Sequence, residues 1–448
     1  MGLMIVLAVA GLLSGAISAV PASPTRDPSA PGPHRTTPRC SSLGVNPNVR
    51  PTHPVAPTVD TPLGVCRALG TPTSKGPSVR HLTTLGSRAA SKAKQQYTSA
   101  TGIHLDDAPA TCGAVNGWEY DRFQACAIRL LDWDLVNLNT GEVIGGLETA
   151  LITIDLSYDL TEALEHYSLL QVQSLWGYGS DAWVMSYIGT CTVYCTGGAY
   201  EPVPFPVAYD TEFESPDIYW GSAGIGQIGY AHMLSDFNPI NATAGSNDND
   251  WVVDDSPRFR CDDVLEEDDQ PPGCIDASSD LPTFYIPTIQ YPNIAAHTAA
   301  AQGSGLPGSR LSGTYLTRMR NKTAIRANRD RACRSSYYRA PGTQCDEYPY
   351  ASTYEGAAAK NSDMSYKGPV RTFPKCYIPQ LAALTITAIH GASACMVPTT
   401  ENQAQSNALR GFYNQQRILD GNGFWVQVQG TRYKPRLVVG CTANEPVL

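Results

Sequence analysis

One stretch of sequence decides the fold prediction: residues Gln344 to Gly356, which read QCDEYPYASTYEG. Its tyrosines favour extended structure, because aromatic side chains fit a half-buried pleated surface. Side chains alternate along a strand, so the adjacent carboxylates Asp346 and Glu347 are expected to point to opposite faces. One of them can then face a cleft while the other orients it or faces water. The alternative is a solvated surface pair, because acidic side chains are mostly exposed.

A second stretch is predicted to form a helix that packs on the same sheet. Residues 397–403 read VPTTENQ, in which Thr400 and Gln403 have the spacing of a capping box, so a helix should begin at Glu401. Asn402 falls in the first turn of this helix and off its apolar face, where it can look back over the edge of the sheet. The predicted apolar face consists of Ala404, Ala408, Leu409 and Phe412.

The two stretches resemble one known family. CDEYPYASTYEGA, residues 345–357, is similar to the signature of the NucA/NucB-type deoxyribonucleases, a family of secreted or surface DNases, and residues 397–403 and 417–421 (RILDG) match it further on. The resemblance covers less than the last third of the chain. It implies a ββα-metal-like nuclease domain that hydrolyses DNA phosphodiester bonds as a secreted, metal-dependent endonuclease. Asp420 is expected to serve a turn rather than catalysis.

The chemistry implied by the resemblance needs few side chains. Hydrolysis of a phosphodiester requires an activated water and a hard cation on the phosphate oxygens, which also stabilises the leaving oxygen. We assign the general base to Asp346, with Glu347 as its orienting partner or an outer-shell metal ligand. One divalent cation is expected on Asn402 and Glu401, either magnesium or manganese, with calcium as the alternative, because such ions take oxygen ligands. His390 lies outside the motif and is assigned a structural role.

The net charge of −9 hides a strong division along the chain. Residues 101–300 hold 31 acidic and four basic side chains, whereas residues 301–448 hold 18 basic and eight acidic ones. A positive C-terminal segment suits DNA as its partner, and an acidic neighbour is expected to shield it from DNA. A solvated basic face is the alternative. The candidate contacts to DNA phosphates are Arg331, Arg334 and Arg417.

The sequence predicts an α+β protein in four parts. Residues 1–19 are apolar and end in a small-residue site typical of a signal peptide. Residues 20–62 are a linker rich in Pro, Ser and Thr. Residues 63–300 contain a short helix and then runs of β-branched and aromatic residues, typical of a sandwich-like β domain of unknown role. Residues 305–448 form the nuclease-like domain.

The thirteen cysteines indicate an exported protein. They do not form CxxC pairs, so a zinc site is not expected, and close neighbours can form disulfides in an oxidising compartment. The first apolar run is too short to span a membrane. We therefore expect a soluble secreted protein that acts on DNA and has no membrane anchor. Close pairs that could form disulfides include Cys191/Cys195, Cys261/Cys274, Cys333/Cys345 and Cys376/Cys395, but the sequence does not fix the connectivity, and the odd count leaves at least one thiol unpaired or missing its partner.

Other interpretations stay open. The acidic tract of residues 246–269 either holds calcium through Asp248, Asp250, Asp254 and Asp255 or forms a solvated loop. The whole chain is alternatively a catalytically inactive exported DNA-binding or adhesion module, because residues 404–407 replace the small residue or glycine pair usual in the family. An exported protease is not supported, since the chain lacks the G-x-S-x-G and H-E-x-x-H motifs.

Overall fold

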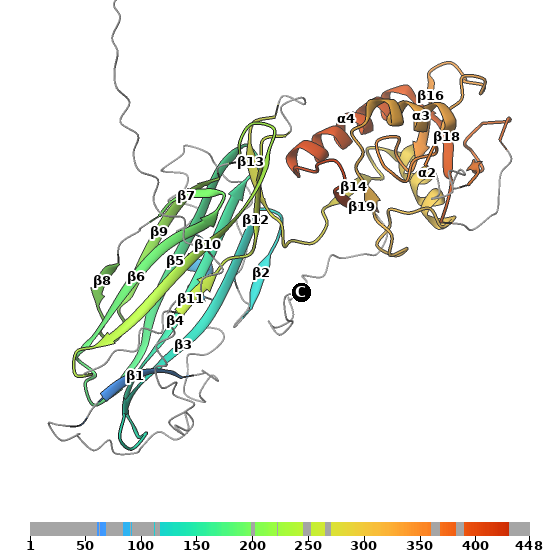
Figure 1. Ribbon diagram of the computed structural model, residues 1–448. Coiled ribbons are helices and arrows are strands. Elements are labelled where there is room, and N and C mark those ends of the chain that lie inside the picture. Colours follow the sequence, from blue (N-terminus) through green and yellow to red (C-terminus); the bar gives the residue numbers. More distant parts are fainter. Residues whose placement is uncertain are drawn as a thin grey trace, which may run out of the picture.

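The computed structural model describes residues 61, 63–68, 84–89, 91, 112, 117–198, 202–221, 223–244, 252–264, 270–359, 368–381 and 389–429. The expected signal peptide, nearly all of the linker, and Asp248 and Asp250 of the acidic tract lie outside these ranges. Among the described helices, none has the length and apolar content that a membrane crossing requires. The described chain is mixed α+β, with many strands and few helices, and forms two domains (Figure 1).

The first of these, called here the β-rich domain, contains two stacked sheets (Figure 1). Its strands are β1 (Leu63–Ala68), β2 (Trp118–Tyr120), β3 (Gln124–Asn137), β4 (Val143–Tyr158), β5 (Thr161–Gly177), β6 (Trp183–Val193), β7 (Cys195–Gly197), β8 (Val203–Pro206), β9 (Glu212–Gly221), β10 (Ile228–Asn241), β11 (Val252–Asp255), β12 (Phe259–Asp262) and β13 (Gly273–Asp276). One sheet has the order β1-β3-β4-β5-β9-β7, with β2 beside β3. The other has the order β13-β12-β10-β6-β8, with β11 beside β10.

The core of this domain lies between the two sheets. Trp133 on β3, Trp183 on β6 and Phe237 on β10 belong to one buried apolar cluster. Strand β4 is buried on both of its faces, because a second cluster covers its outer side and includes Leu85 and Ala89 of the helical segment 84–89. The predicted sandwich and its short preceding helix are therefore present.

The second part, called here the C-terminal domain, carries three helices among the described residues. Its elements are β14 (Thr283–Pro287), α2 (Pro292–Gly303), β15 (Leu316–Thr317), α3 (Lys322–Ala332), β16 (Thr343–Tyr348), β17 (Val370–Arg371), β18 (Ala392–Pro398), α4 (Thr399–Gln415) and β19 (Gly423–Gln429). They form two small sheets, with the orders β14-β19-β15 and β16-β18-β17.

The C-terminal domain begins earlier than the expected boundary at residue 305. Strand β14 pairs in parallel with β19, and Phe284 of β14 lies in the same buried cluster as Phe424 and Val426 of β19. Ile294 of α2 belongs to that cluster too. Helix α2, which ends before that boundary, also contributes Ala295 and Ala301 to the buried core. The domain therefore starts near residue 283.

The two expected strands and the expected helix lie together. Strand β16 pairs antiparallel with β18, with Asp346 opposite Cys395, and α4 follows β18 directly. The helix begins at Thr399, and no side chain caps its N-terminus. Its buried residues are Gln405, Leu409 and Tyr413, whereas Ala404 is exposed. The buried face of the helix therefore begins at Gln405, one position after the predicted Ala404. Whether this unit is a ββα-metal site remains a prediction.

The disulfides confirm the expected pairing of close cysteines. All four candidate pairs are joined, and Cys112 is joined to Cys126 in addition. The bond between Cys333 and Cys345 ties the end of α3 to β16, one residue before Asp346. Helix α3 is thereby fixed beside the predicted carboxylate pair.

Candidate functional site

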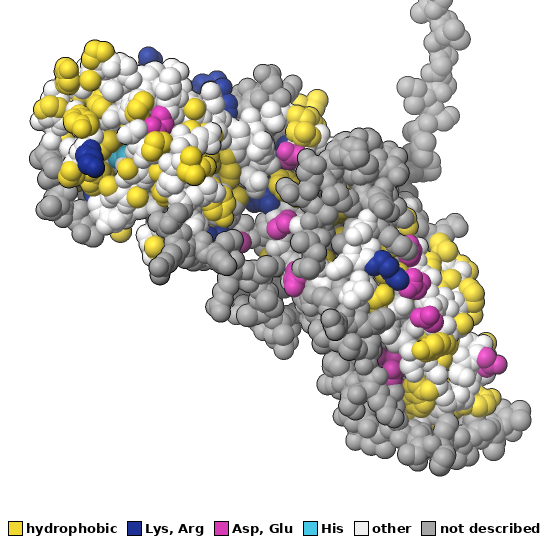
Figure 2. All heavy atoms as spheres, turned by 180° about the vertical axis from the view of Figure 1, so that it is seen from behind, with side chains coloured by type: hydrophobic (Ala, Val, Ile, Leu, Met, Phe, Trp, Pro, Cys, Tyr) yellow, Lys and Arg dark blue, Asp and Glu magenta, His cyan; other side chains and the backbone are white. Residues whose placement is uncertain are grey.

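A cleft of about 830 Å³ opens between α3, β16 and the first turns of α4. Both predicted carboxylates line it, as does Asn402. The described residues that line it all lie between Arg318 and Tyr413, so the β-rich domain contributes none of them. In Figure 2, Lys and Arg side chains gather mainly over the C-terminal domain and Asp and Glu over the β-rich domain. The charge division seen in the sequence is thus also a division in space.

Asp346 is held by a histidine from another element. His297, on α2, has its Nδ1 atom 2.6 Å from Oδ2 of Asp346. Its Nε2 atom lies 2.9 Å from the hydroxyl of Ser393 on β18. Asp346 is 6% exposed and His297 2% exposed, so the pair is shielded from bulk water. An imidazole held at both nitrogens fixes the orientation of the carboxylate.

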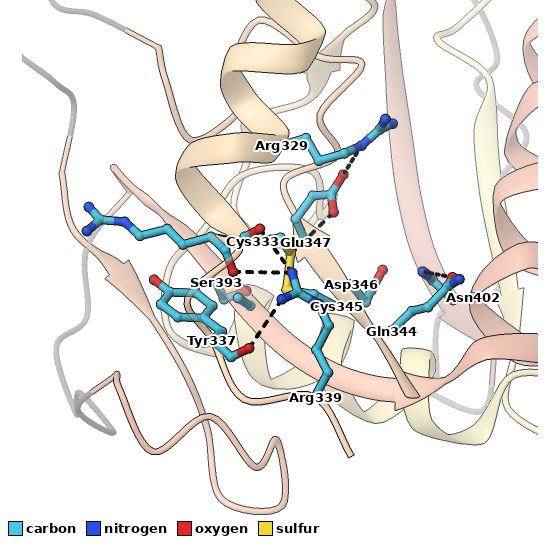
Figure 3. Close-up of a disulfide and its surroundings, with 12 residues drawn as sticks. Arg329, Cys333, Tyr337, Arg339, Gln344, Cys345, Asp346, Glu347, Ser393 and Asn402 are labelled. Carbon is cyan, nitrogen blue, oxygen red and sulfur yellow. Dashed lines mark hydrogen bonds and ion pairs between the residues drawn. A yellow bond between two sulfur atoms is a disulfide. The ribbon is translucent and has the colours of Figure 1, made fainter. Parts of the chain in front are cut away.

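Glu347 points to the other face of β16, as the strand alternation predicted. Its carboxylate lies 3.9 Å from Nε of Arg329 and 3.6 Å from the sulfur of Cys333, both on the side of α3. Burial raises the pKa of Glu347 to about 7, the neighbouring charge of Asp346 adds to the rise, and Arg329 opposes it. Figure 3 shows Glu347 reaching toward Arg329, with the pair formed by Gln344 and Asn402 on the other side of Asp346.

The position of β16 explains how both carboxylates reach one cleft. This strand is at the edge of its sheet, because the order is β16-β18-β17. A cleft along a sheet edge is open to side chains from both faces of the edge strand. Asp346 and Glu347 therefore point apart and still line the same cleft. The sequence predicted the alternation but not the edge position.

Asn402 lies in the first turn of α4 and looks over the edge of the sheet, as expected. Its amide nitrogen donates a hydrogen bond to the side-chain oxygen of Gln344, at 3.2 Å. Gln344 precedes Asp346 by two positions and shares its face of β16. Because the amide nitrogen is used in this way, the Asn402 carbonyl oxygen is the atom available to a ligand.

Glu401, the other predicted metal ligand, is held elsewhere. Its Oε1 atom accepts hydrogen bonds from the backbone N–H groups of Asn293 and Ile294, at 2.7 and 2.8 Å. Its Oε2 atom accepts from the Asn293 side chain. These groups form the N-terminus of α2, where a carboxylate also interacts favourably with the helix dipole. The carboxylate of Glu401 thus anchors α2 to α4 and does not line the cleft.

Of the predicted phosphate-binding arginines, Arg417 lies away from Arg331 and Arg334, which are at and just after the end of α3. Arg417 is completely buried at the contact with the β-rich domain, so it is not available to DNA and that prediction was wrong. Arg331 and Arg334 do not line the cleft. The cationic side chains that do line it are Arg318, Arg320, Lys322, Arg329, Arg339 and Arg410.

Side-chain oxygens of the kind that a hard divalent cation takes are among the atoms that line the cleft. Asn402 and Glu347 carry such oxygens, and the carboxylates of buried Asp346 and partly buried Glu347 are neighbours on β16. A bound cation would offset the burial and, second to it, the neighbouring charge of Asp346, which together raise the pKa of Glu347. Among the described residues, no three His, Cys, Asp or Glu side chains converge on one point. Magnesium and manganese suit such a sparse site, because they keep several waters and need few protein ligands.

Sequence reasoning missed His297. It lies before residue 305, the expected start of the nuclease-like domain. A signal was present, because Pro292 suits the first helical position, and Ile294, Ala295, Thr298 and Ala301 recur at helical spacing. A helix there places His297 on the buried face. His390, which was considered instead, is exposed and outside the cleft.

Comparison with known proteins gives one match. Residues 308–427 match the family model described as Deoxyribonuclease NucA/NucB. Searches of curated proteins and of solved structures found no match to the chain. The matched range includes β16, β18 and α4 but stops short of α2. His297 therefore reaches Asp346 from outside the matched segment.

Proposed function

We propose that the NucA/NucB deoxyribonuclease domain in the C-terminal third of this chain is a metal-dependent endonuclease that hydrolyses phosphodiester bonds of DNA. The family match supports deoxyribonuclease activity. The observation that carries the mechanism is the chain of contacts from Ser393 through His297 to Asp346, at the wall of a cleft lined with cationic side chains.

Asp346 acts as the general base in this proposal. The hydrogen bond from His297 engages its Oδ2 atom, so its Oδ1 atom is left to accept a proton from a water in the cleft. His297 orients the carboxylate through a hydrogen bond formed in a buried place. Ser393 holds the ring of His297 in turn. Such positioning matters because a base must lie within hydrogen-bond reach of the proton it removes.

Asn402 and Glu347 are the proposed metal ligands. A divalent cation bound there would supply Lewis-acid stabilisation to the phosphate and to the leaving 3′ oxygen. Glu347 must be ionised to serve as a ligand, and its raised pKa makes this sensitive to pH near neutrality. Glu401 is left out, because its carboxylate is bound to the N-terminus of α2. Arg320, Lys322 and Arg410 can contact the flanking phosphates.

The disulfides, of which five lie wholly within the described part of the chain, suit action in an oxidising compartment. A secreted protein that degrades DNA outside the cell accounts for them and for the family match together. The role of such an activity, whether nutrient release or attack on other cells, depends on where the substrate DNA is found.

A plasmid-nicking assay tests the proposed function. The full chain should convert supercoiled DNA to nicked circles with magnesium or manganese and should stop when EDTA is added. The variant Asp346→Asn serves as the matched control, because it keeps the size of the side chain and removes the base. DNA binding without nicking in any divalent ion would favour the inactive DNA-binding module, and nicking in EDTA would refute the metal requirement.

A further inference from the structure

The loop between α4 and β19, residues Gln416 to Asn422, forms hydrogen bonds with the β-rich domain. Arg417 in this loop reaches into the β-rich domain and is completely buried. Its Nη2 and Nε atoms donate to the two carboxylate oxygens of Asp262, at 2.6 and 3.2 Å. Its other hydrogen bonds go to the backbone carbonyls of Asp262, Asp159 and Pro271. An arginine has five N–H donors, and all five are used on the β-rich domain.

Contacts also run in the opposite direction, from the β-rich domain to the same loop. Arg260 on β12 donates to the carbonyl of Arg417 and, at 2.7 Å, to the side-chain oxygen of Asn422. Arg122 donates twice to the carbonyl of Gln416, at 3.0 and 2.8 Å. The backbone of Arg417 adopts a positive φ of 42°, which a side chain with a Cβ disfavours. The loop is thus held in an unfavourable conformation by groups of the other domain.

The loop in turn supports one wall of the cleft, the segment Arg318 to Arg320. The backbone N–H of Arg318 donates to the Asn422 carbonyl, and its own carbonyl accepts from the N–H of Gly421, both at 2.9 Å. The backbone N–H of Arg320 donates to the Asp420 carboxylate at 2.8 Å. The guanidinium of Arg318 donates to the carbonyl of Ile418. Any shift of the loop therefore moves this segment of the cleft wall.

Arg320 connects the β-rich domain to the cleft directly as well. Its side chain lines the cleft, and its Nη1 atom donates to the carbonyl of Val264, two residues after Asp262. Arg320 is therefore fixed at both ends by the same part of the β-rich domain. Its backbone is fixed through Arg417 and Asp420, and its guanidinium through Val264.

We propose that Asp262 is a positioning residue of the nuclease. Through Arg417 it fixes the α4–β19 loop, and through that loop it places Arg320 in the cleft to contact a phosphate of the DNA substrate. The β-rich domain is then a working part of the nuclease and not a separate passenger. This proposal rests on the proposed function. The alternative is that Asp262 only holds the domains together and has no effect on substrate binding.

A double-mutant cycle in the full chain separates these alternatives. Asp262→Asn should raise the KM for a short DNA duplex about three- to tenfold with little change in kcat, because uniform binding is lost. Arg320→Gln should raise KM by a similar factor. It should also make the slope of log binding constant against log salt concentration shallower by about one, because one phosphate contact is lost. The KM of the combined variant should equal that of Arg320→Gln within about twofold, since both changes remove the same contact.

Two control variants show how an independent substitution and a neutral substitution behave in this cycle. Arg410→Gln removes a cleft cation on α4 that the loop does not hold. The factors by which Arg410→Gln and Asp262→Asn raise KM should therefore multiply in the combined variant. Asp181→Asn removes an exposed carboxylate of the β-rich domain and should behave as wild type. If Asp262→Asn does not fold, Arg260→Gln takes its place under the same criteria, since it removes the contacts to Arg417 and Asn422.

The outcomes distinguish the two proposals. If the wild-type chain does not cut DNA, the proposed function is wrong whatever the variants do. If the wild type cuts DNA but Asp262→Asn has wild-type kinetics and salt dependence, only the positioning role is refuted. The positioning role is also refuted if the effects of Asp262→Asn and Arg320→Gln multiply as those of independent sites.

Discussion

His297 Nδ1 lies 2.6 Å from Asp346 Oδ2, and this contact joins two elements that the chain separates by 49 residues. The histidine comes from α2, outside the segment that matches the family model, and the carboxylate comes from β16, within that segment. The pair is buried, so its hydrogen bond is formed in a low-dielectric environment where geometry is tightly held. Any account of the site must therefore include α2.

Replacing Asp346 tests the general base. Asp346→Asn should lower kcat by roughly 10²- to 10⁴-fold, which is the usual contribution of a positioned base, while KM for DNA stays close to wild type. The amide still fills the space and can still bond to His297, so the melting temperature should change little. Measurement of kcat and KM with a fluorescent duplex checks this, and wild-type nicking by the variant would reassign the base.

His297 can be tested with two substitutions that differ in one hydrogen bond. His297→Asn places an amide near the position of Nδ1 and should keep part of the contact with Asp346, whereas His297→Ala removes it. The alanine variant should lose activity by at least about tenfold more than the asparagine variant. Without its partner, the buried Asp346 carboxylate is no longer held in place, and burying it unpaired costs folding free energy. Equal activities of the two variants would show that the contact does not position the base.

The raised pKa of Glu347 predicts how metal binding depends on pH. Below its pKa of about 7 the side chain is protonated and cannot bind a cation. The magnesium concentration needed for half-maximal nicking should therefore fall as pH rises from 6 to 8, by at most about tenfold per pH unit. Glu347→Gln should flatten this dependence and require more metal throughout. If the metal requirement of the variant changed with pH as that of the wild type does, Glu347 would not be a metal ligand.

The same shift predicts a stability effect in the absence of metal. A folded-state pKa above the ordinary value of 4.5 means that the stabilising contribution of Glu347 is complete below about pH 4.5 and is lost as pH rises through about 7. Between pH 6 and 8 in EDTA, the wild type should therefore lose stability relative to Glu347→Gln. Thermal melts of both proteins measure this difference, and comparison with the variant cancels other buried acids such as Asp276.

Asn402 is predicted to bind metal through its carbonyl oxygen. Asn402→Ala should raise the divalent-ion concentration for half-maximal activity by about tenfold or more, because it removes one of very few protein ligands. Gln403→Ala is the matched control, since Gln403 is the next residue, is exposed and does not line the cleft. An unchanged metal titration in Asn402→Ala would place the metal elsewhere.

Glu401 should behave as a structural residue. Glu401→Gln weakens the cap on α2 and should lower stability by about 0.5–2 kcal/mol, as other helix-cap substitutions do. Its metal titration should match that of the wild type, because its carboxylate faces Asn293 and Ile294. A large increase in the metal requirement without loss of stability would restore Glu401 as a ligand. Chemical denaturation and the nicking assay give the two measurements.

The sequence by itself determined the features that depend on near neighbours. Alternation along β16 placed Asp346 and Glu347 on opposite faces, since successive strand side chains must point apart. Four candidate pairs of close cysteines are joined, at separations of only 4 to 19 residues, so the sequence indicated these pairs although it did not fix the connectivity. The β-rich sandwich and the helix after β18 followed from patterns of a few residues.

Only the tertiary structure decided which distant element packs against each face. Periodicity tells that a side chain is buried but carries no information about its partner, and the decisive partners are far apart along the chain. Glu401 meets Asn293 across 108 residues, and Arg417 meets Asp262 across 155. Both side chains were expected at the cleft from their local motifs. The carboxylate of Glu401 binds a helix N-terminus, where the helix dipole favours it, and the buried guanidinium of Arg417 binds the other domain, because a buried charge must be paired.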